Sequence, residues 1–283
     1  MGEIAEFESP VLSIEQDEGV ATVWLDRAEA RNAMGPDLWR DLQRAMAAVS
    51  GDAAVRAVVI AAKGPHFSVG LDLKAMGHVL TGGGDRQASG GTSSAARARA
   101  GRTEVLRLQD AITAVSRCPK PVIAAVHGYC IGGGVDLIAA CDIRLASADA
   151  VFSVREAKMA IVADLGSLQR LPAIIGPGHL AELAYTGKDI TAERAKEIGL
   201  VNDVAADADG VLKSGHAMAA EIAANSPLAV QGSKAVLAAN DGRTVAEGLD
   251  YVATWNAGML ASDDLTEAVT AFLEKRTPRF TGR

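Results

Sequence analysis

The chain has 283 residues, 49% hydrophobic and 22% charged, a composition typical of a folded protein with room for one large domain. Its formal net charge of -7 at pH 7 gives no electrostatic reason to expect nucleic acid as a partner. The acidic segment Met1–Pro10 lacks the apolar core of a signal peptide, and no apolar run reaches membrane-spanning length. We therefore expect neither a nucleic-acid partner nor a membrane partner.

The cysteines indicate a reducing compartment. Cys118, Cys130 and Cys141 lie in apolar segments, are odd in number, and lack the spacing of metal ligands. They are typical of small buried side chains with free thiols. We therefore predict a cytoplasmic location.

The first part of the chain alternates between predicted strands and helices. Strands are expected at Val11–Gln16 and Val20–Leu25, and Pro36 is a suitable first residue for the helix that follows. The later apolar runs suit strands buried on both faces. These runs are Val55–Ala62, Val122–His127, Ile143–Ala146 and the shorter Val151–Val154.

Residues 81–101 are rich in Gly, Ser, Ala and Arg, which predicts a mobile loop with frayed helix at its end. A helix is expected from Val105 to Arg117, where Pro119 and Pro121 stop it. A further helix, Val135–Cys141, is expected after a run of glycines. Strand and helix therefore alternate, which favours an α/β fold.

From Ala192 onward the pattern is helical. Thr191 is a suitable N-cap and Gly199 a suitable terminator for the first of these helices. The helices expected after it are Pro227–Ala239, Val245–Leu260 and Leu265–Lys275.

The run Gly132–Gly134 follows one of these strands and precedes a helix. Backbone N–H groups at such a place favour negative charge on a ligand, although a tight turn that needs glycine explains the run equally well. The amide of Leu71, just after Gly70, is a second candidate donor. Two converging N–H groups, from Leu71 and Gly133, would form an oxyanion hole.

Three carboxylates accompany the glycine run. Asp136 falls in the first turn of the helix, where an acid also suits the helix dipole, and Glu156 follows a short strand. Asp164 lies between apolar neighbours, so we expect a buried carboxylate with a raised pKa. Ion pairing of Asp164 with Arg155 or Arg170 is the structural alternative to a role in proton transfer.

Other catalytic chemistries find little support in the sequence. His66 and His127 have no accompanying Ser or Cys nucleophile motif, so we interpret both as structural. No cluster with metal-ligand spacing is visible, and no metal site is predicted.

The chain resembles the enoyl-CoA hydratase/isomerase (crotonase) superfamily along nearly its whole length. The segments that carry this resemblance are Arg31–Met34, Phe67–Lys74, Lys120–Gly128, the glycine run, Cys141–Arg144, Thr186–Gly187, Gly199–Val201 and Ala271–Arg276.

Within the superfamily, the chain is most similar to the Δ3,5-Δ2,4-dienoyl-CoA isomerases. Typical hydratases have Glu at the place of Asp136 and Gly at the place of Asp164, and this chain keeps only Glu156 of their two catalytic carboxylates. The segments similar to the isomerases are Ser116–Pro121, Cys130–Leu137, Ala163–Pro172 and Leu249–Asn256.

The resemblance implies a spiral of repeated ββα units followed by a helical trimerisation region. It divides the chain into a core with the acyl-CoA site, residues 1–190, and the helical region, residues 191–283. It also implies a homotrimer or a dimer of trimers.

The resemblance further implies an isomerase that converts a 3,5-dienoyl-CoA into a 2,4-dienoyl-CoA in fatty-acid β-oxidation. Leu71 and Gly133 would hold the thioester oxygen, Glu156 would take a proton from C2, and Asp164 would deliver one to C6. Asp136 would orient or tune this pair. No cofactor is expected, because coenzyme A is part of the substrate.

The segment around Gly70 is also expected to bind the substrate and its coenzyme A. Arg31 and Lys74 are candidate partners for the phosphates, although solubility is a competing explanation for surface cations. The other candidate substrate-binding residues are Ser68, Gly70 and Asp72.

Three other functions remain open at this point. A 2-enoyl-CoA hydratase would use Glu156 with Asp136, and a Δ3-Δ2-enoyl-CoA isomerase would need one dominant acid/base. A homologue without activity, acting as a scaffold or an RNA-binding protein, is less consistent with the net acidity and the three carboxylates.

Overall fold

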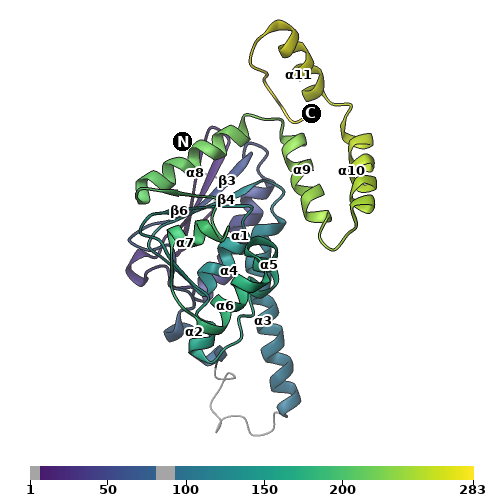
Figure 1. Ribbon diagram of the computed structural model, residues 1–283. Coiled ribbons are helices and arrows are strands. Elements are labelled where there is room, and N and C mark those ends of the chain that lie inside the picture. Colours follow the sequence, from purple (N-terminus) through teal and green to yellow (C-terminus); the bar gives the residue numbers. More distant parts are fainter. Residues whose placement is uncertain (1–6, 81–92) are drawn as a thin grey trace.

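The computed structural model describes residues 7–80 and 93–283, and Figure 1 shows how their elements are arranged. The larger sheet has six strands in the order β1-β2-β3-β4-β6-β9. The first two strands are antiparallel, and the remaining pairs are parallel. The strands are β1 (Leu12–Asp17), β2 (Val20–Leu25), β3 (Ala57–Ala62), β4 (Val122–Val126), β6 (Ile143–Ser147) and β9 (Asp203–Ala205).

A second sheet contains β5 (Tyr129–Ile131), β7 (Val151–Ser153) and β8 (Ile190–Thr191). The pair β4–β5 leads into α4 (Gly133–Ala139), and the pair β6–β7 leads into η2 (Glu156–Met159). Each pair places one strand in the larger sheet and one in the smaller, and a helix follows it. The chain therefore winds as a spiral of ββα units, which confirms the predicted α/β fold.

Helices cover both faces of the larger sheet, because side chains alternate along each buried strand. Val59 and Ala125 pack toward α8 (Ala208–Ala223) on one face. Val58 and Ile60 belong to the larger core on the other face. The remaining helices of this part are η1 (Ala28–Ala30), α1 (Pro36–Gly51), α2 (Leu73–Leu80), α3 (Ser94–Arg117), α5 (Ser167–Ile175), α6 (Pro177–Thr186) and α7 (Ala192–Glu197).

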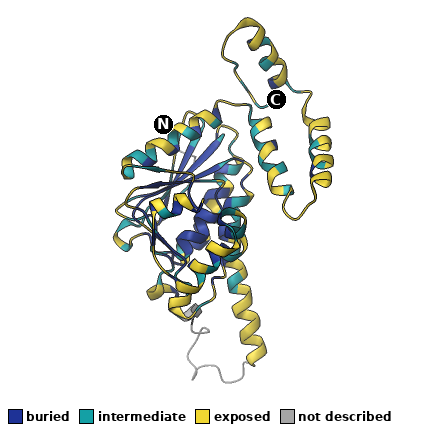
Figure 2. Cartoon of the chain, in the orientation of Figure 1, coloured by how far each residue is buried: buried dark blue, intermediate teal, exposed yellow. Residues whose placement is uncertain are grey.

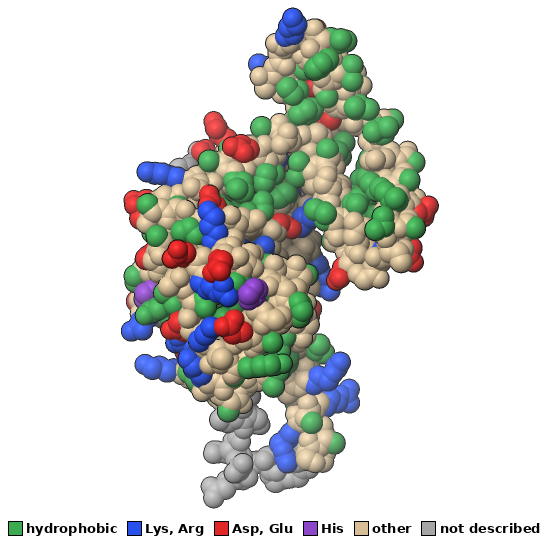
Figure 3. Space-filling view, in the orientation of Figure 1, with side chains coloured by type: hydrophobic (Ala, Val, Ile, Leu, Met, Phe, Trp, Pro, Cys, Tyr) green, Lys and Arg blue, Asp and Glu red, His purple; other side chains and the backbone are tan. Residues whose placement is uncertain are grey.

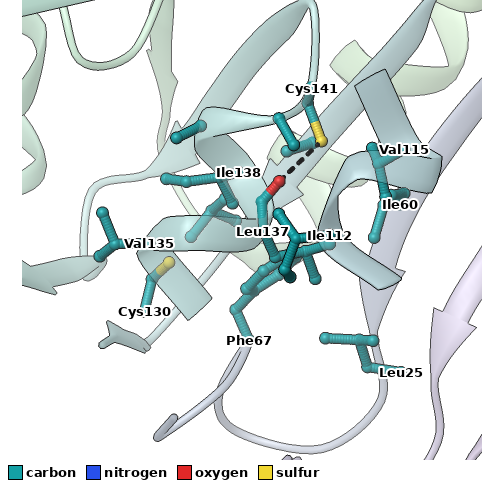
Figure 4. Packing of buried hydrophobic residues seen from close by; sticks show 14 of the residues in the cluster. Leu25, Ile60, Phe67, Ile112, Val115, Cys130, Val135, Leu137, Ile138 and Cys141 are labelled. Carbon is teal, nitrogen blue, oxygen red and sulfur yellow. Dashed lines mark hydrogen bonds between the residues drawn. The ribbon is translucent and has the colours of Figure 1, made fainter. Parts of the chain in front are cut away.

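The larger core surrounds α4, as Figure 4 shows. Phe67, Ile112 and Leu137 are fully buried there and fix the position of this short helix. Cys118, Cys130 and Cys141 are all buried with free thiols, which confirms the prediction for the cysteines. The glycine run and Asp136 are therefore attached to the most buried part of the molecule.

The predicted helix boundaries agree best with the observed ones where the sequence has a strong capping residue. The helix Pro227–Ala239 is found as predicted, and Thr191 caps α7 by accepting a hydrogen bond from Arg194 N. The helix expected at the end of the predicted loop 81–101 is found over residues 94–101, where it is regular rather than frayed and forms the start of α3. Ser93 caps this helix, and the Ala and Arg that follow favour helix. Residues 81–92 lie outside the described part of the chain.

The predicted boundary between residues 190 and 191 falls inside the folded core. Strand β9 pairs with β6 in the larger sheet, and α8 packs against β3, β4 and β6. The helices outside the sheet begin later, with α9 (Pro227–Ala239), α10 (Val245–Met259) and α11 (Asp263–Glu274). We call these three helices the arm; Figure 1 shows them projecting from the core.

The arm leaves many apolar side chains in contact with solvent (Figures 2 and 3). Phe272 is 82% exposed and Leu237 is 72% exposed. A hollow of about 810 Å³ lies among the three helices and is lined by apolar residues that include Trp255 and Met259. So much exposed apolar surface is typical of an interaction site.

Candidate active site

Three loops of the candidate site lie side by side at one edge of the smaller sheet. Each follows a strand or bridge residue that pairs with its neighbour. Ser68 forms a parallel bridge with Cys130 of β5, and β5 pairs in parallel with β7. The carboxyl ends of parallel strands meet at one edge, so the loops that follow them lie side by side. These loops carry Gly70–Leu71, the glycine run Gly132–Gly134, and Glu156.

The Gly70 turn packs closely against the glycine run. Gly70 has a φ of 83°, and a Cβ placed on it would lie 2.7 Å from the carbonyl oxygen of Ile131 and 3.5 Å from Gly133 N. No larger residue fits there without moving the backbone. The tight approach brings the neighbouring Leu71 amide close to the Gly133 amide.

These two amides are available donors. Gly70 O accepts a hydrogen bond from Met34 N at 2.8 Å, and Asp72 N donates to Met34 O at 3.0 Å, which leaves the N–H of Leu71 between them. The N–H of Gly133 lies at the start of α4, where no helical acceptor exists. Within the described ranges, neither N–H has a recorded acceptor. Such donors are the parts of an oxyanion hole.

Glu156 lies against the glycine run. A Cβ on Gly132, whose φ is 55°, would lie 3.2 Å from Glu156 Oε1. The other oxygen, Oε2, is buried and has no hydrogen-bond partner within the described ranges. Burial raises the pKa of Glu156, and the nearby Asp164 carboxylate raises it further. A buried carboxylate oxygen without a partner is a candidate proton acceptor for a ligand.

Asp136 is the most buried of the three acids, with 1% of its surface exposed. Its Oδ1 accepts a hydrogen bond from Ser167 N at 2.6 Å. Burial raises the pKa of Asp136 to about 7, and repulsion from Glu156 acts in the same direction. Asp136 therefore changes its charge near neutral pH, in contrast to an ordinary aspartate.

The expectation that Asp164 is buried is wrong. Its apolar neighbours Ala163 and Leu165 are buried, but the turn of the loop directs the Asp164 side chain to an exposed position. Gln109 of α3 holds the loop by donating to Asp164 O at 2.6 Å. Partial burial of the carboxyl group still raises its pKa.

The ion-pair alternative for Asp164 is not found in the structure. Arg155 pairs with Asp189, and the Arg170 guanidinium donates to the carbonyl of Leu165. Asp164 has no recorded cation partner among the described residues. The Asp164 carboxylate still affects the site electrostatically, because its negative charge helps to raise the pKa values of Asp136 and Glu156.

Two of the predicted substrate-binding side chains stabilise the Gly70 turn instead. Ser68 is fully buried; its hydroxyl donates to Asn32 O and accepts from Gly70 N. Asp72 pairs with Arg27 at 2.7 Å and accepts hydrogen bonds from the first amides of α2. These internal contacts leave neither side chain free to bind coenzyme A in this structure.

Arg31 and Lys74 remain candidates for binding phosphate. Both are exposed, and neither side chain has a recorded ion pair in the ranges that the structure describes. Burial lowers the pKa of His66, and the positive charge of Arg31 lowers it further. The histidines are held by local contacts: His127 Nε2 meets Gly64 O at 2.8 Å, and the His66 ring packs on Tyr129.

The sequence does not indicate that Ser167 and Gln109 hold the acids in place, and it suggests Arg170 only as an ion-pair partner of Asp164. Ser167 and Arg170 of α5, and Gln109 of α3, contact the loop around Asp164 or Asp136 itself. A serine just after Asp164-Leu165-Gly166 is a signal for a helix start, but α5 was not predicted. Without that helix, nothing in the sequence connects Ser167 with Asp136.

The chain belongs to the enoyl-CoA hydratase/isomerase family, whose model matches residues 15–283. It is 43% identical over 264 residues to the peroxisomal Δ(3,5)-Δ(2,4)-dienoyl-CoA isomerase of Arabidopsis thaliana, which covers 93% of each chain. It is also 43% identical to the mitochondrial Δ(3,5)-Δ(2,4)-dienoyl-CoA isomerase of Mus musculus, over 91% of this chain and 77% of the relative. The predicted resemblance to this superfamily, and to the dienoyl-CoA isomerases within it, is confirmed.

A solved structure supports the fold independently. The crystal structure of an enoyl-CoA hydratase from Bacillus anthracis superposes with a TM-score of 0.85 at 30% identity. The match covers 96% of this chain and 100% of the bacterial enzyme.

The raised pKa of Asp136 should make the stability of the protein depend on pH. The ordinary pKa of an aspartate is 3.8, whereas folded Asp136 keeps its proton to about pH 7. The proton therefore favours the folded state at low pH, and this contribution is lost as the pH rises through about 4 to 7. Asp136→Asn stays neutral and should exceed the wild type in stability at about pH 8 by on the order of 3 kcal/mol.

Urea unfolding at several pH values between about 5 and 8 measures this difference. Asp209→Asn is the matched control, because it makes the same change at an exposed acid in the first turn of α8, outside the candidate site. Equal pH dependence in the wild type and in Asp136→Asn would contradict the assignment of a raised pKa to Asp136.

Proposed function

We propose that this chain is an isomerase that converts a 3,5-dienoyl-CoA into the 2,4-dienoyl-CoA in fatty-acid β-oxidation. The observation that carries the proposal is the buried oxygen of Glu156 beside two amides, none of which has a hydrogen-bond partner among the described residues, with Asp164 as an additional acid. The dienoyl-CoA isomerases among the relatives, at 43% identity, support an isomerase activity.

The first step forms an extended enolate. The amides of Leu71 and Gly133 bind the thioester oxygen, and this makes the C2 proton acidic because the negative charge moves onto that oxygen. Glu156 accepts the C2 proton, and the electron pair of the broken C–H bond enters the conjugated chain. The raised pKa of Glu156 suits a group that must take up a proton near neutral pH.

The second step returns a proton at the far end of the chain. Asp164 donates a proton to C6, and the electrons withdraw from the oxygen to leave double bonds at C2 and C4. The step needs Asp164 protonated while Glu156 is ionised, so the two acids must differ in environment. The greater exposure of Asp164 by itself favours its ionised form, so the division depends on the bound acyl chain covering Asp164. The reaction needs no metal and no redox cofactor.

Asp136 tunes the other two acids. It is buried and repels a negative charge on Glu156, so its own protonation state changes the basicity of Glu156. Because the three carboxylates interact, the pH dependence of the reaction belongs to the group as a whole. Arg31 and Lys74 supply cations for the coenzyme A phosphates.

A 2-enoyl-CoA hydratase is the second candidate function. The similarity to the Bacillus anthracis enoyl-CoA hydratase favours it, and Glu156 with Asp136 forms an acid pair that could activate a water molecule. In that reaction Asp164 has no proton to move. A Δ3-Δ2-enoyl-CoA isomerase would likewise depend on one dominant acid rather than on Asp164. The unpartnered polar groups of the site argue against a homologue without activity.

Substitution of Asp164 separates these functions. Asp164→Asn keeps the volume but removes the transferable proton, so dienoyl isomerisation should fall by about 10²–10⁴. Hydration of a 2-enoyl-CoA should stay largely intact. Steady-state assays with 3,5-octadienoyl-CoA and crotonyl-CoA measure both reactions in each protein.

Asp110→Asn is the matched control, because Asp110 is an exposed acid on α3, next to the Gln109 that holds the Asp164 loop. Dienoyl isomerisation that survives Asp164→Asn at the wild-type rate would overturn the mechanism. Detection of hydration alone in the wild type would overturn the assignment as a dienoyl-CoA isomerase.

Substitution of Gly133 tests the oxyanion hole. Proline is tolerated at the first position of a helix and lacks an N–H, so Gly133→Pro removes the donor at the start of α4. Loss of one such donor should lower kcat by about 10²–10³. Gly133→Ala is the control, since it keeps the N–H while adding a Cβ that meets Met34 Sδ at 2.8 Å. Equal losses in both variants would indicate a packing effect and contradict the role of the amide.

We also propose that the arm forms the contact surface of a homotrimer or of a dimer of trimers. Phe272 and Leu273 are more than two-thirds exposed, and a second copy would bury them. Phe272→Glu should therefore shift the sedimentation coefficient toward that of the monomer. Tyr185→Glu is the matched control, because Tyr185 is equally exposed but lies on α6 of the core. A wild type that sediments as a monomer would contradict the proposal.

The predicted location and partners follow from the cysteines, the net charge and the apolar pattern of the sequence. We propose an enzyme that works in the cytoplasm, with neither a membrane nor nucleic acid as a partner. Among the described residues, no helix combines the length and the apolarity needed to cross a membrane. The names of the two isomerase relatives assign those proteins to peroxisomes and mitochondria.

A further inference from the structure

Ser167 contacts the most buried acid of the site. It is the first residue of α5 and is 1% exposed. Its amide donates to Asp136 Oδ1 at 2.6 Å, whereas its hydroxyl oxygen is buried and has no partner of normal hydrogen-bond geometry within the described ranges. The hydroxyl is nevertheless close enough to lower the pKa of Asp136, against the larger effect of burial. A rotation about the Cα–Cβ bond is enough to form or break such a contact.

The backbone holds Ser167 in this position. Gly166 has a φ of 129°, and a Cβ on it would lie 1.7 Å from Arg170 Nη1, so the guanidinium packs directly over the turn. Arg170 also donates to Leu165 O and to Thr113 of α3. Arg170 therefore connects the start of α5 both to the turn before it and to α3. Ser167 cannot move away from Asp136 unless these contacts break.

The charged groups around Asp136 act on its carboxyl group through their charge, whereas Ser167 can form hydrogen bonds with it. Glu156 and Asp164 raise the pKa of Asp136 by repulsion, while Arg170 carries a positive charge that interacts with it. Cys130 of β5 is a buried neutral thiol whose pKa lies well above its ordinary value because of burial. Within the described ranges, none of these groups forms a hydrogen bond with the Asp136 carboxyl group. The amide of Ser167 does so, but it can only donate.

A hydroxyl group both donates and accepts, so it suits either protonation state of a carboxyl group. We propose that Ser167 is a positioning residue whose hydroxyl donates to Asp136 when the acid is ionised and accepts from it when the acid is protonated. Ser167 thereby sets the pH at which Asp136 changes its charge. This inference rests on the proposed function only where it concerns catalysis, because the titration of Asp136 is a property of the folded protein.

Two variants of nearly equal shape test the role of the hydroxyl. Ser167→Thr keeps the hydroxyl, and Ser167→Val replaces it with a methyl group. A hydrogen bond to a charged group is stronger than one to a neutral group, so its loss should raise the pKa of Asp136 by about one pH unit in Ser167→Val. Ser167→Thr should titrate as the wild type does. Carbon-13 NMR of the aspartate carboxyl groups in the full chain measures this, with Asp136→Asn used to assign the signal.

The pH profile of kcat for 3,5-octadienoyl-CoA is the second measurement. It should move with the titration in Ser167→Val and stay in place in Ser167→Thr, while KM is unchanged in both. If the bulkier variants do not fold, Ser167→Ala removes the hydroxyl without added volume and is compared with the wild type. Identical Asp136 titration with and without the hydroxyl would overturn the inference.

The two measurements keep this inference separate from the proposed function. A shifted Asp136 titration in a protein that does not isomerise the dienoyl-CoA would overturn the proposed function and support the role of Ser167. Isomerisation with an unchanged titration and an unchanged pH profile would overturn the role of Ser167 alone.

Discussion

The backbone contact between the Gly70 turn and the glycine run Gly132–Gly134 determines the geometry of the whole site. A side chain on Gly70 would meet the carbonyl of Ile131 at 2.7 Å, so the two turns approach as closely as backbone atoms allow. This approach places on neighbouring loops two N–H groups that have no acceptor in the part of the chain that the structure describes. It also explains why the Ser68 side chain points inward, since its hydroxyl accepts from Gly70 N, a donor of the tight turn. Asp72 caps the helix α2 that follows.

The same contact sets the electrostatics of the three acids. Glu156 packs against Gly132, and Asp136 lies one turn into the helix that the glycine run begins. Their closeness, together with burial, raises the pKa values of both acids, so the group holds a proton to higher pH than ordinary carboxylates do. Asp164 approaches from a separate loop that α3 and α5 hold in place. Acids that arrive from different elements can have different exposure and therefore different pKa shifts.

The sequence predicted much of the fold because its local signals agree with the final structure. Strand β2, the helix Pro227–Ala239 and the cap at Thr191 are found as predicted, since apolar periodicity and capping residues act within a few positions of the chain. Helices α5 and α6 escaped prediction, because their apolar residues pack on other elements: α5 contacts α4, and α6 contacts η2. The exposed start of α3 was expected only as frayed helix.

For the site, the sequence by itself determined the residue types: a glycine run, two candidate amides and three carboxylates. Only the tertiary structure decided how each group is placed. Asp136 is buried and Asp164 is exposed, although their neighbours in the sequence are equally apolar. Burial, free hydrogen-bonding capacity and shifted pKa values depend on atoms far away in the sequence, such as those of Ser167 and Gln109. For that reason a local pattern indicates which side chains can react, and the packing of distant elements determines how they do so.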